Sequence, residues 1–241
     1  IVKLNSTGGI EWQNTIGGLH LDYAEIIREL PDGSFIVAGN SSSAIGYDKT
    51  VDLHGTGGLT YDIWVLKLTS TGSIIWQKNI GGSADDYFSD IILTADGGYL
   101  IGAESYSGIS YDKTEPLFGD SDNWLIKLDA EGNIEWDKTF GGNNLDYIGG
   151  LVETSDGNFV IGAYSLSGIS GNKTEINHGY DYWVYKIDTS GNIIWQNTVG
   201  GFDSDFLYAI SATTDNGVMV IGESNSGANI DKDEVSIGGT A

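Results

Sequence analysis

One tryptophan motif recurs four times along the chain, and this repetition constrains the fold more than any other feature. The motif reads I-x-W-[QD]-[KN], its copies are spaced 64, 60 and 59 residues apart, and a Gly-Gly pair follows each copy. Its tryptophans are Trp12, Trp76, Trp136 and Trp195. A second motif, D-x-W-[VL]-x-K, holds the other three, Trp64, Trp124 and Trp183, so the repeat accounts for every tryptophan. Self-similarity at a fixed period predicts an array of equivalent structural units.

Each repeat is predicted to contain four short antiparallel strands. In the second copy, residues 64–68 and 74–80 are rich in β-forming residues and flank the turn Thr-Ser-Thr-Gly-Ser, a pattern typical of a hairpin. Residues 87–94 and 99–105 predict a second hairpin, joined at Ala95-Asp96-Gly97. A Gly/Ser/Asp-rich connection over residues 106–121 then leads to the next copy. Nothing in the sequence predicts a helix.

Four-stranded antiparallel units favour an all-β fold, a β-propeller with four repeats of about 60 residues. We expect a single repeat domain over residues 1–241, with approximate repeats at 1–64, 65–124, 125–183 and 184–241. Fused sandwiches are the alternative architecture. Residues 1–3 align with residues 125–127, and residue 241 aligns with residue 121. This phase fits a closed four-bladed ring, which we expect, or part of a larger array, and we expect the chain to be a fragment of a larger protein.

Charge and cysteine content exclude several classes of partner and cofactor. The chain has 34 acidic and 11 basic residues and a formal charge of −23. This charge repels phosphate backbones and anionic lipid surfaces, so we expect no nucleic-acid partner and no electrostatic association with a membrane. No stretch approaches the roughly eighteen apolar residues that span a bilayer, so we expect no direct membrane insertion. Without cysteine, neither a disulfide framework nor a cysteine-based zinc site is available.

The recurrent charged residues are predicted to be structural. An acid followed by an aromatic residue recurs five positions after the first glycine of each Gly-Gly pair. A catalytic carboxylate pair would need two acids in unlike environments. We therefore interpret these acids, Asp22, Asp86, Asp146 and Asp205, as acceptors for backbone N–H groups at a loop-to-strand corner. Two lysine columns should each neutralise a local acid or cover an aromatic face. They contain Lys3, Lys67, Lys127 and Lys186, and Lys49, Lys113, Lys173 and Lys232.

Two sets of loop residues are candidates for binding. The acids that begin the D-x-W motif, Asp62, Asp122 and Asp181, supply oxygen ligands of the kind that Ca²⁺ prefers, although capping carboxylates are the alternative interpretation. Tyrosines in the variable loops are candidates for stacking on a sugar: Tyr47, Tyr106, Tyr111, Tyr164 and Tyr180. The three histidines share no column and no zinc spacing. We predict no catalytic residue and, apart from calcium, no cofactor.

The repeat unit resembles a known class of sequence. The units D-N-W-L-I-K-L-D-A-E-G-N-I-E-W-D-K-T-F-G-G and T-S-D-G-N-F-V-I-G-A-Y-S-L-S-G-I-S-G-N-K-T-E resemble tandem repeats of large secreted or surface proteins of Bacteroidetes, the cargo of type IX secretion. The resemblance covers essentially the whole chain and implies export and a non-catalytic module joined to other domains. The hairpins are also similar to the blades of quinoprotein-like propellers, but no quinone or metal site is evident.

These observations favour a secreted or cell-surface scaffold or adhesion module that binds a glycan or a protein through its variable loops. The alternative is a glycan-processing or quinoprotein-like propeller enzyme with acids that line a central channel. Such an enzyme needs a group of residues that departs from the repeat, and the sequence shows none.

Overall fold

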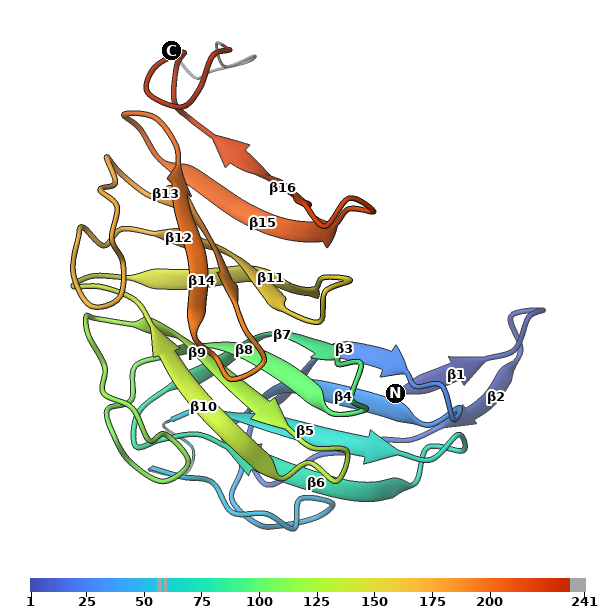
Figure 1. Cartoon of the computed structure of the whole chain (residues 1–241). Helices are drawn as coiled ribbons and strands as arrows, with labels where there is room; N and C mark the ends of the chain where they lie inside the picture. Colours follow the sequence, from blue (N-terminus) through green and yellow to red (C-terminus); the bar gives the residue numbers. More distant parts are fainter. Residues whose placement is uncertain (56–57, 59, 235–241) are drawn as a thin grey trace. The chain divides into compact units, whose positions relative to one another are not determined.

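The computed structural model describes residues 1–55, 58 and 60–234, which form sixteen β-strands and no helix (Figure 1). Three complete sheets each contain four antiparallel strands in chain order. Among these residues there is accordingly no helical segment long and apolar enough to cross a bilayer. The predicted all-β class and the predicted four-strand composition of the repeat are therefore confirmed.

The strands of the complete sheets fall close to the predicted bounds. The first sheet contains β3 (Asp22–Glu29), β4 (Phe35–Ser41), β5 (Asp62–Leu68) and β6 (Ile74–Ile80). The second contains β7 (Asp86–Leu93), β8 (Tyr99–Ser105), β9 (Asp122–Leu128) and β10 (Ile134–Phe140). The third contains β11 (Asp146–Glu153), β12 (Phe159–Ser165), β13 (Asp181–Ile187) and β14 (Ile193–Val199).

Two further sheets have only two strands each. One pairs β1 (Val2–Leu4) with β2 (Ile10–Gln13), and the other pairs β15 (Asp205–Ala212) with β16 (Val218–Ser224). By position in the repeat, β1 and β2 correspond to the last two strands of a complete sheet. The strands β15 and β16 correspond to the first two strands. These two half sheets do not pair with each other in the structure, so the expected closure of a four-bladed ring is not observed.

The Asp-Gly turns explain where the second hairpin of each repeat reverses direction. Gly33, Gly97 and Gly157 have φ angles of 79°, 88° and 78°, in the left-handed region that glycine adopts without a steric penalty. In the last copy, Asn216 adopts the same region with φ of 67°. Asparagine tolerates this conformation better than other residues with a side chain, so the turn survives the change.

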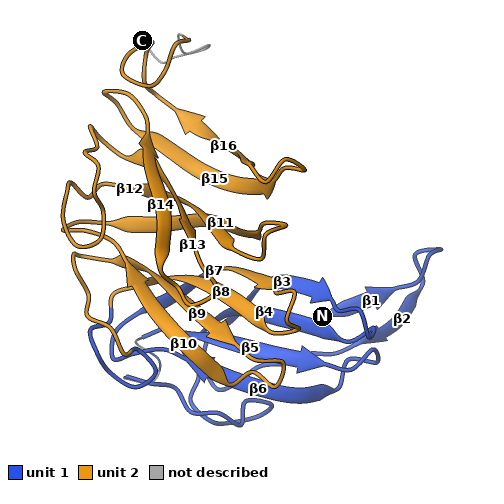
Figure 2. Ribbon diagram, viewed as in Figure 1, with its two compact units in different colours: residues 1–88, 107–113 blue, residues 89–106, 114–241 orange. Residues whose placement is uncertain are grey.

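The chain divides into two compact units (Figure 2). Unit 1 consists of residues 1–88 and 107–113, and unit 2 of residues 89–106 and 114–241. In unit 1, Trp64 and Phe35 lie in an apolar cluster that Trp12 covers edge-on, and the ring centroids of Trp12 and Phe35 are 6.1 Å apart. The inner strands of the first sheet, β4 and β5, are largely apolar runs, and nearly every residue in them is buried, which is typical of strands covered on both faces.

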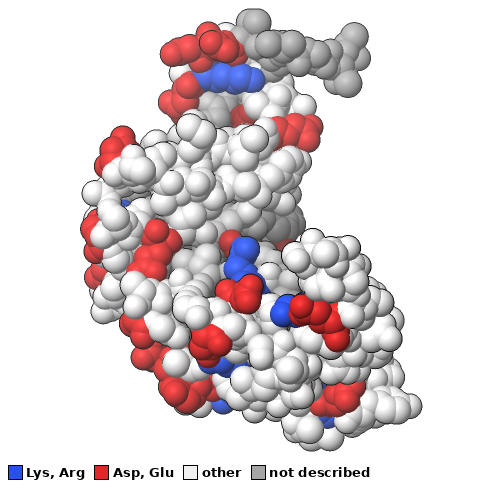
Figure 3. Space-filling model, turned by 90° about the vertical axis from the view of Figure 1, so that its right-hand side faces the viewer, with Lys and Arg blue, Asp and Glu red and all other residues white. Residues whose placement is uncertain are grey.

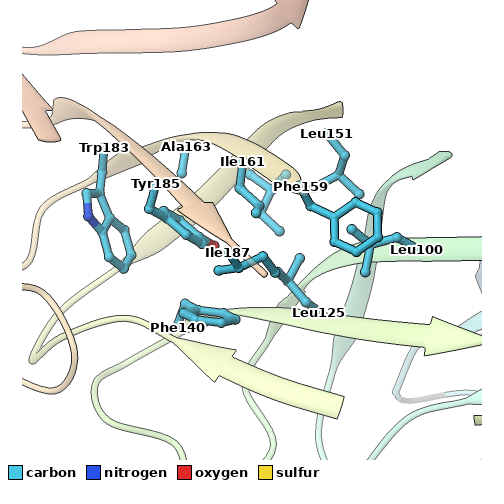
Figure 4. Close-up of a cluster of buried hydrophobic side chains, with 11 residues drawn as sticks. Leu100, Leu125, Phe140, Leu151, Phe159, Ile161, Ala163, Trp183, Tyr185 and Ile187 are labelled. Carbon is cyan, nitrogen blue, oxygen red and sulfur yellow. The ribbon is translucent and has the colours of Figure 1, made fainter. Parts of the chain in front are cut away.

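A cluster of eleven buried apolar residues in unit 2 lies between two of its sheets (Figure 4). Tyr185 and Phe140 point toward each other with ring centroids 5.1 Å apart, and Trp183 lies 4.5 Å from Tyr185. Phe159, the first residue of β12, is buried in the same cluster. Its equivalent in the last copy, Val218, is only half-buried, because β16 has no third strand beside it.

Candidate functional site

The acid that begins the first strand of each sheet is a structural cap. Its carboxylate accepts a hydrogen bond from the second glycine of the Gly-Gly pair, from Gly18 to Asp22 at 2.6 Å and from Gly142 to Asp146 at 2.9 Å. A serine hydroxyl also donates to it, as Ser167 does to Asp146 at 2.8 Å. Asp86 and Asp205 make the same two contacts. This agrees with the interpretation of the acid column as acceptors at a loop-to-strand corner.

Three members of the second lysine column are buried beside this corner, Lys49, Lys113 and Lys173, and Lys232 is half-buried. Lys49 donates to the Ser41 hydroxyl at 2.7 Å and to the Asn79 amide oxygen at 2.9 Å, and its ammonium lies 5.2 Å from the centre of the Trp64 ring. Burial lowers the pKa of Lys49 to about 8, although nearby carboxylates, Asp22 first among them, oppose the shift. Lysine thus covers an aromatic face, as predicted. A buried lysine with this many partners holds the loop in place, and its ammonium group is not available to bind a ligand.

The first lysine column holds the Asp-Gly turns. Lys127 pairs with Asp96 at 2.9 Å, and Lys186 pairs with Asp156 at 2.7 Å. Hydrogen bonds to Thr94, to Lys127 and to the turn backbone outweigh partial burial and lower the pKa of Asp96 to about 2. On the face drawn in Figure 3, the few basic side chains likewise lie beside acidic ones.

The calcium candidates are buried in three separate sheets and do not form one oxygen cage. Asp62 accepts hydrogen bonds from the backbone N–H of His54 at 2.7 Å and from the Asn79 amide at 2.5 Å. Asp122 and Asp181 accept equivalent backbone bonds from the loop that precedes each of them. In the part of the chain that the structure describes, no three His, Asp or Glu residues are grouped to hold a metal ion.

These carboxylates explain why the first residue of the Gly-Gly pair has no side chain. A Cβ atom at Gly81 would lie 2.2 Å from Oδ1 of Asp62, and one at Gly141 would lie 2.0 Å from Oδ1 of Asp122. The Asp62 Oδ1 atom is buried and has no hydrogen-bond partner among the described residues. Burial raises the pKa of Asp62 to about 6, against the hydrogen bonds that Asn79 and His54 donate.

Two of the five candidate tyrosines lie at the tips of tight turns. Tyr47 and Tyr111 have φ angles of 52° and 48°, and the same position of the third copy is Gly171 with φ of 57°. Tyr47 is 83% exposed. Tyr111 stacks on His54 with ring centroids 4.5 Å apart and planes 3° apart. These two residues occupy the left-handed position of the turn that leads to the buried lysine, and the structure does not place them with the other candidates.

Two of the other three candidates, Tyr164 and Tyr180, belong to one aromatic group in unit 2. Tyr164 and Tyr180 contact each other at 5.9 Å between centroids, and Tyr147 stacks on Tyr164 at 5.0 Å. Phe206 lies 5.4 Å from Tyr164 and 5.2 Å from Tyr180. We call these four half-buried rings the tyrosine cluster. They come from the starts of β11 and β15, the end of β12 and the loop before β13.

Tyr106 joins the tyrosine cluster through polar contacts. Its hydroxyl donates to Glu104 at 2.6 Å and hydrogen-bonds to Tyr147. Burial raises the pKa of Tyr106 and of Tyr164 to about 12 and raises the pKa of Tyr147 further. All these hydroxyls therefore stay protonated at neutral pH, able to donate as well as accept hydrogen bonds, beside a carboxylate that only accepts.

The sequence analysis missed one position that departs from the repeat. The second-last residue of each second strand is Asn40, Glu104, Tyr164 and Glu223 in the four copies. In unit 1, Tyr23, Tyr61 and Tyr87 are arranged as a row with centroid distances of 6.1 and 5.7 Å, without a central ring. This variable position becomes visible when the repeats are aligned by the ends of their second strands instead of by their tryptophans.

A cavity of about 110 Å³ in unit 1 is a weaker candidate. Val37, Trp64 and Leu66 line it, with Asp22 at its edge. The Asp22 carboxylate already accepts bonds from Gly18 and two serines. A mostly apolar space whose single acid is satisfied is a packing gap, not a site for polar recognition.

Comparison with known proteins places the repeat only loosely. The chain matches no family model. It is similar to the regulatory protein FlaEY of Caulobacter vibrioides, at 25% identity over 169 residues, which are 67% of this chain and 17% of that protein. The match thus spans only a small part of the length of that relative.

Two solved structures share a limited likeness with the fold. The mannose phosphorylase MPT-4 of Leishmania mexicana gives a TM-score of 0.41 at 12% identity, over 80% of this chain and 61% of that chain. A protein of unknown function from Bacteroides caccae gives 0.31 at 11% identity, over 74% of this chain and 72% of that chain. Both scores lie below 0.5, so neither comparison carries an argument about function.

Proposed function

We propose that this chain is a non-catalytic scaffold of the β-propeller type, presented outside the cell, that binds glycan through the tyrosine cluster. The observation that supports this most directly is the arrangement of Tyr147, Tyr164, Tyr180 and Phe206, whose rings are half-buried and lie within 5.0–5.9 Å of Tyr164. Rigid aromatic rings with hydroxyl groups give a binding surface a large contact area at a low cost in conformational entropy.

The chemistry of the tyrosine cluster matches a sugar. The apolar face of a pyranose ring stacks on an aromatic ring, and its hydroxyl groups pair with the Tyr106 hydroxyl and the Glu104 carboxylate. The charge of −23 repels acidic polysaccharides. We therefore propose neutral oligosaccharides as the ligand class.

The rest of the repeat serves to hold this surface in place. The buried acids and lysines at the strand ends are engaged in hydrogen bonds that recur from copy to copy, as Asp22 and Asp146 illustrate. Three of the four residues of the tyrosine cluster lie at strand ends and only Tyr180 lies in a loop, so the sheets themselves hold the binding surface. Secretion or surface display, with further domains of the parent protein as partners, follows from the resemblance to Bacteroidetes repeats and is part of the proposal.

The experiment uses a panel of neutral cello-, xylo- and manno-oligosaccharides with the wild-type chain and Tyr164→Ala. We expect binding by calorimetry to at least one member and a loss of at least about tenfold in affinity in the variant, since removing a central stacking ring costs about 1–3 kcal/mol. Tyr47→Ala, at an exposed turn in unit 1, is the matched control and should bind normally.

Two results would contradict the proposal. If no neutral or charged oligosaccharide binds, the tyrosine cluster is a packing feature. If the chain turns over one of the oligosaccharides, as product analysis would reveal, the scaffold assignment is wrong and the enzyme alternative replaces it.

A further inference from the structure

Three of the four rings in the tyrosine cluster occupy positions that recur in other repeats. Tyr180, which directly precedes the third copy of the D-x-W motif, lies between Tyr147 of its own repeat and Phe206 of the next one, with ring centroids 6.3 and 5.2 Å away. Tyr147 and Phe206 each follow the capping aspartate of their repeat. A row of three rings therefore forms where two neighbouring repeats have aromatic residues at these positions.

Unit 1 contains a second row with the same arrangement. Tyr61 directly precedes the first copy of the D-x-W motif, and its ring lies between those of Tyr23 and Tyr87. The centroid distances are 6.1 Å to Tyr23, from the same repeat, and 5.7 Å to Tyr87, from the next repeat. All three residues belong to unit 1, and we call them the unit 1 row.

The sheets form with or without a ring at this position. In the second repeat the residue that precedes the D-x-W motif is Ser121, and the strand that follows it, β9, pairs with β8 as β5 pairs with β4. The rings of Tyr61 and Tyr180 are therefore additions to the repeat and not conditions for its strand pairing.

The unit 1 row combines accessible rings with hydrogen-bond acceptors. Tyr23 is 50% exposed, and the other two rings are half-buried. The Asp85 carboxylate accepts a hydrogen bond from the Tyr61 backbone N–H at 2.9 Å, and the exposed Glu25 carboxylate accepts one from the Asn40 amide at 3.0 Å. Aromatic rings beside acceptors of this kind match the stacking face and the hydroxyl groups of a pyranose.

We propose that the unit 1 row is a second glycan site, so that each chain binds two glycan segments. This inference rests on the proposed function for its ligand class, and it adds a site outside the tyrosine cluster. Tyr164 supplies a fourth ring in the tyrosine cluster, whereas Asn40 occupies the equivalent position in unit 1. We therefore expect the unit 1 row to bind the same neutral oligosaccharides about tenfold more weakly, because it has one stacking ring fewer.

Calorimetry with cellohexaose, xylohexaose and mannohexaose tests the second site. In the variant Tyr164→Ala/Tyr180→Ala, which lacks two rings of the tyrosine cluster, we expect the tighter site to disappear and the weaker site to remain. Adding Tyr61→Ala should abolish the remaining binding. Tyr23→Ala removes an exposed ring and should weaken the same site with an unchanged circular dichroism spectrum. The matched control is Tyr47→Ala, at another exposed tyrosine of unit 1, which should leave both sites intact.

Light scattering of soluble xylan, galactomannan and hydroxyethylcellulose gives a second readout. A protein with two sites cross-links a polymer that offers many sites, whereas a protein with one site does not. We expect the wild-type chain to increase the scattering of at least one polymer solution. Tyr61→Ala and Tyr164→Ala/Tyr180→Ala should each remove this increase, because each variant retains a single site.

The outcomes separate the second site from the proposed function. If Tyr61→Ala has the stoichiometry and the light scattering of the wild-type chain, the unit 1 row is not a site, and the proposed function stands on the tyrosine cluster alone. If Tyr61→Ala loses binding while Tyr164→Ala/Tyr180→Ala binds like the wild-type chain, the unit 1 row is a site and the tyrosine cluster is not. If none of the three hexaoses binds the wild-type chain, the second site and the proposed ligand class are overturned together.

Discussion

Replacing Asp62 with asparagine should change the dependence of stability on pH. Burial raises the pKa of this carboxyl from 3.8 to about 6 in the folded chain. Between those two values the folded chain holds a proton that the unfolded chain has released, so the free energy of unfolding falls as the pH rises through this window. A shift of about two units, at about 1.4 kcal/mol each, corresponds to about 3 kcal/mol at neutral pH.

Asparagine keeps an acceptor for the His54 backbone and carries no charge, so the Asp62→Asn variant should lose this part of the pH dependence. In denaturant titrations followed by tryptophan fluorescence, we expect the free energy of unfolding of the variant, relative to wild type, to rise by about 3 kcal/mol from about pH 4 to about pH 7. The seven tryptophans, including Trp64 on the same strand as Asp62, supply the fluorescence signal.

The exposed turn residue Asp188 supplies the control with the opposite sign. Hydrogen bonds from Asn192 lower its pKa, so whatever stability it contributes is present above its unfolded pKa and is lost as the pH falls. For Asp188→Asn, the difference from wild type should therefore change only at acid pH. If the curves of Asp62→Asn and wild type run parallel across the whole range, Asp62 is ionised without penalty and the reasoning fails.

Three further predictions follow from local geometry. Gly82→Ala should lower the free energy of unfolding by about 1–3 kcal/mol, because the new Cβ would lie 2.4 Å from that of Ser107, while Gly108→Ala, with open space around it, should change little in the same denaturation assay. Tyr47→Gly should raise the free energy of unfolding by up to about 1 kcal/mol, because glycine adopts the left-handed backbone of this turn without strain. Tyr111→Gly should gain less, because it also loses the stacking of Tyr111 on His54. Thermal melts of the two variants will check this ranking. A chelator should leave the melting temperature unchanged, since the three candidate aspartates bind backbone N–H groups in separate sheets, and a drop of several degrees would restore the calcium interpretation.

Local patterns predicted the strands well, because each strand is a short run of β-forming residues bounded by its own turn residues. The strand expected to begin at Tyr87 begins at Asp86, and the one expected over residues 74–80 has those bounds. Closure of the ring was not predictable in this way. It depends on pairing between segments far apart in sequence, and a repeat phase alone is equally compatible with several partners for the same edge.

The candidate site was only partly accessible from the sequence. Tyr164 and Tyr180 were named from their loop context and do lie together, whereas Tyr47 was chosen on the same grounds and lies at a turn. Loop membership says that a side chain is near the surface, but it does not say which loops meet. The glycine at position 171, in the same column as Tyr47, was the sequence signal for a left-handed turn.

The buried lysine and the buried aspartate of each repeat together define where the chain can change in length. Lys49 and Asp62 are thirteen positions apart, whereas Lys113 and Asp122 are nine apart, which matches the change in repeat length from 64 to 60 residues. The start of the intervening peptide is held to the sheet, because the Thr50 N–H donates to Gln77 and the His54 N–H donates to Asp62, and additional length in a loop costs little entropy. This segment is therefore a natural place to graft a foreign peptide, and a protein of this kind can diversify there without redesigning its core.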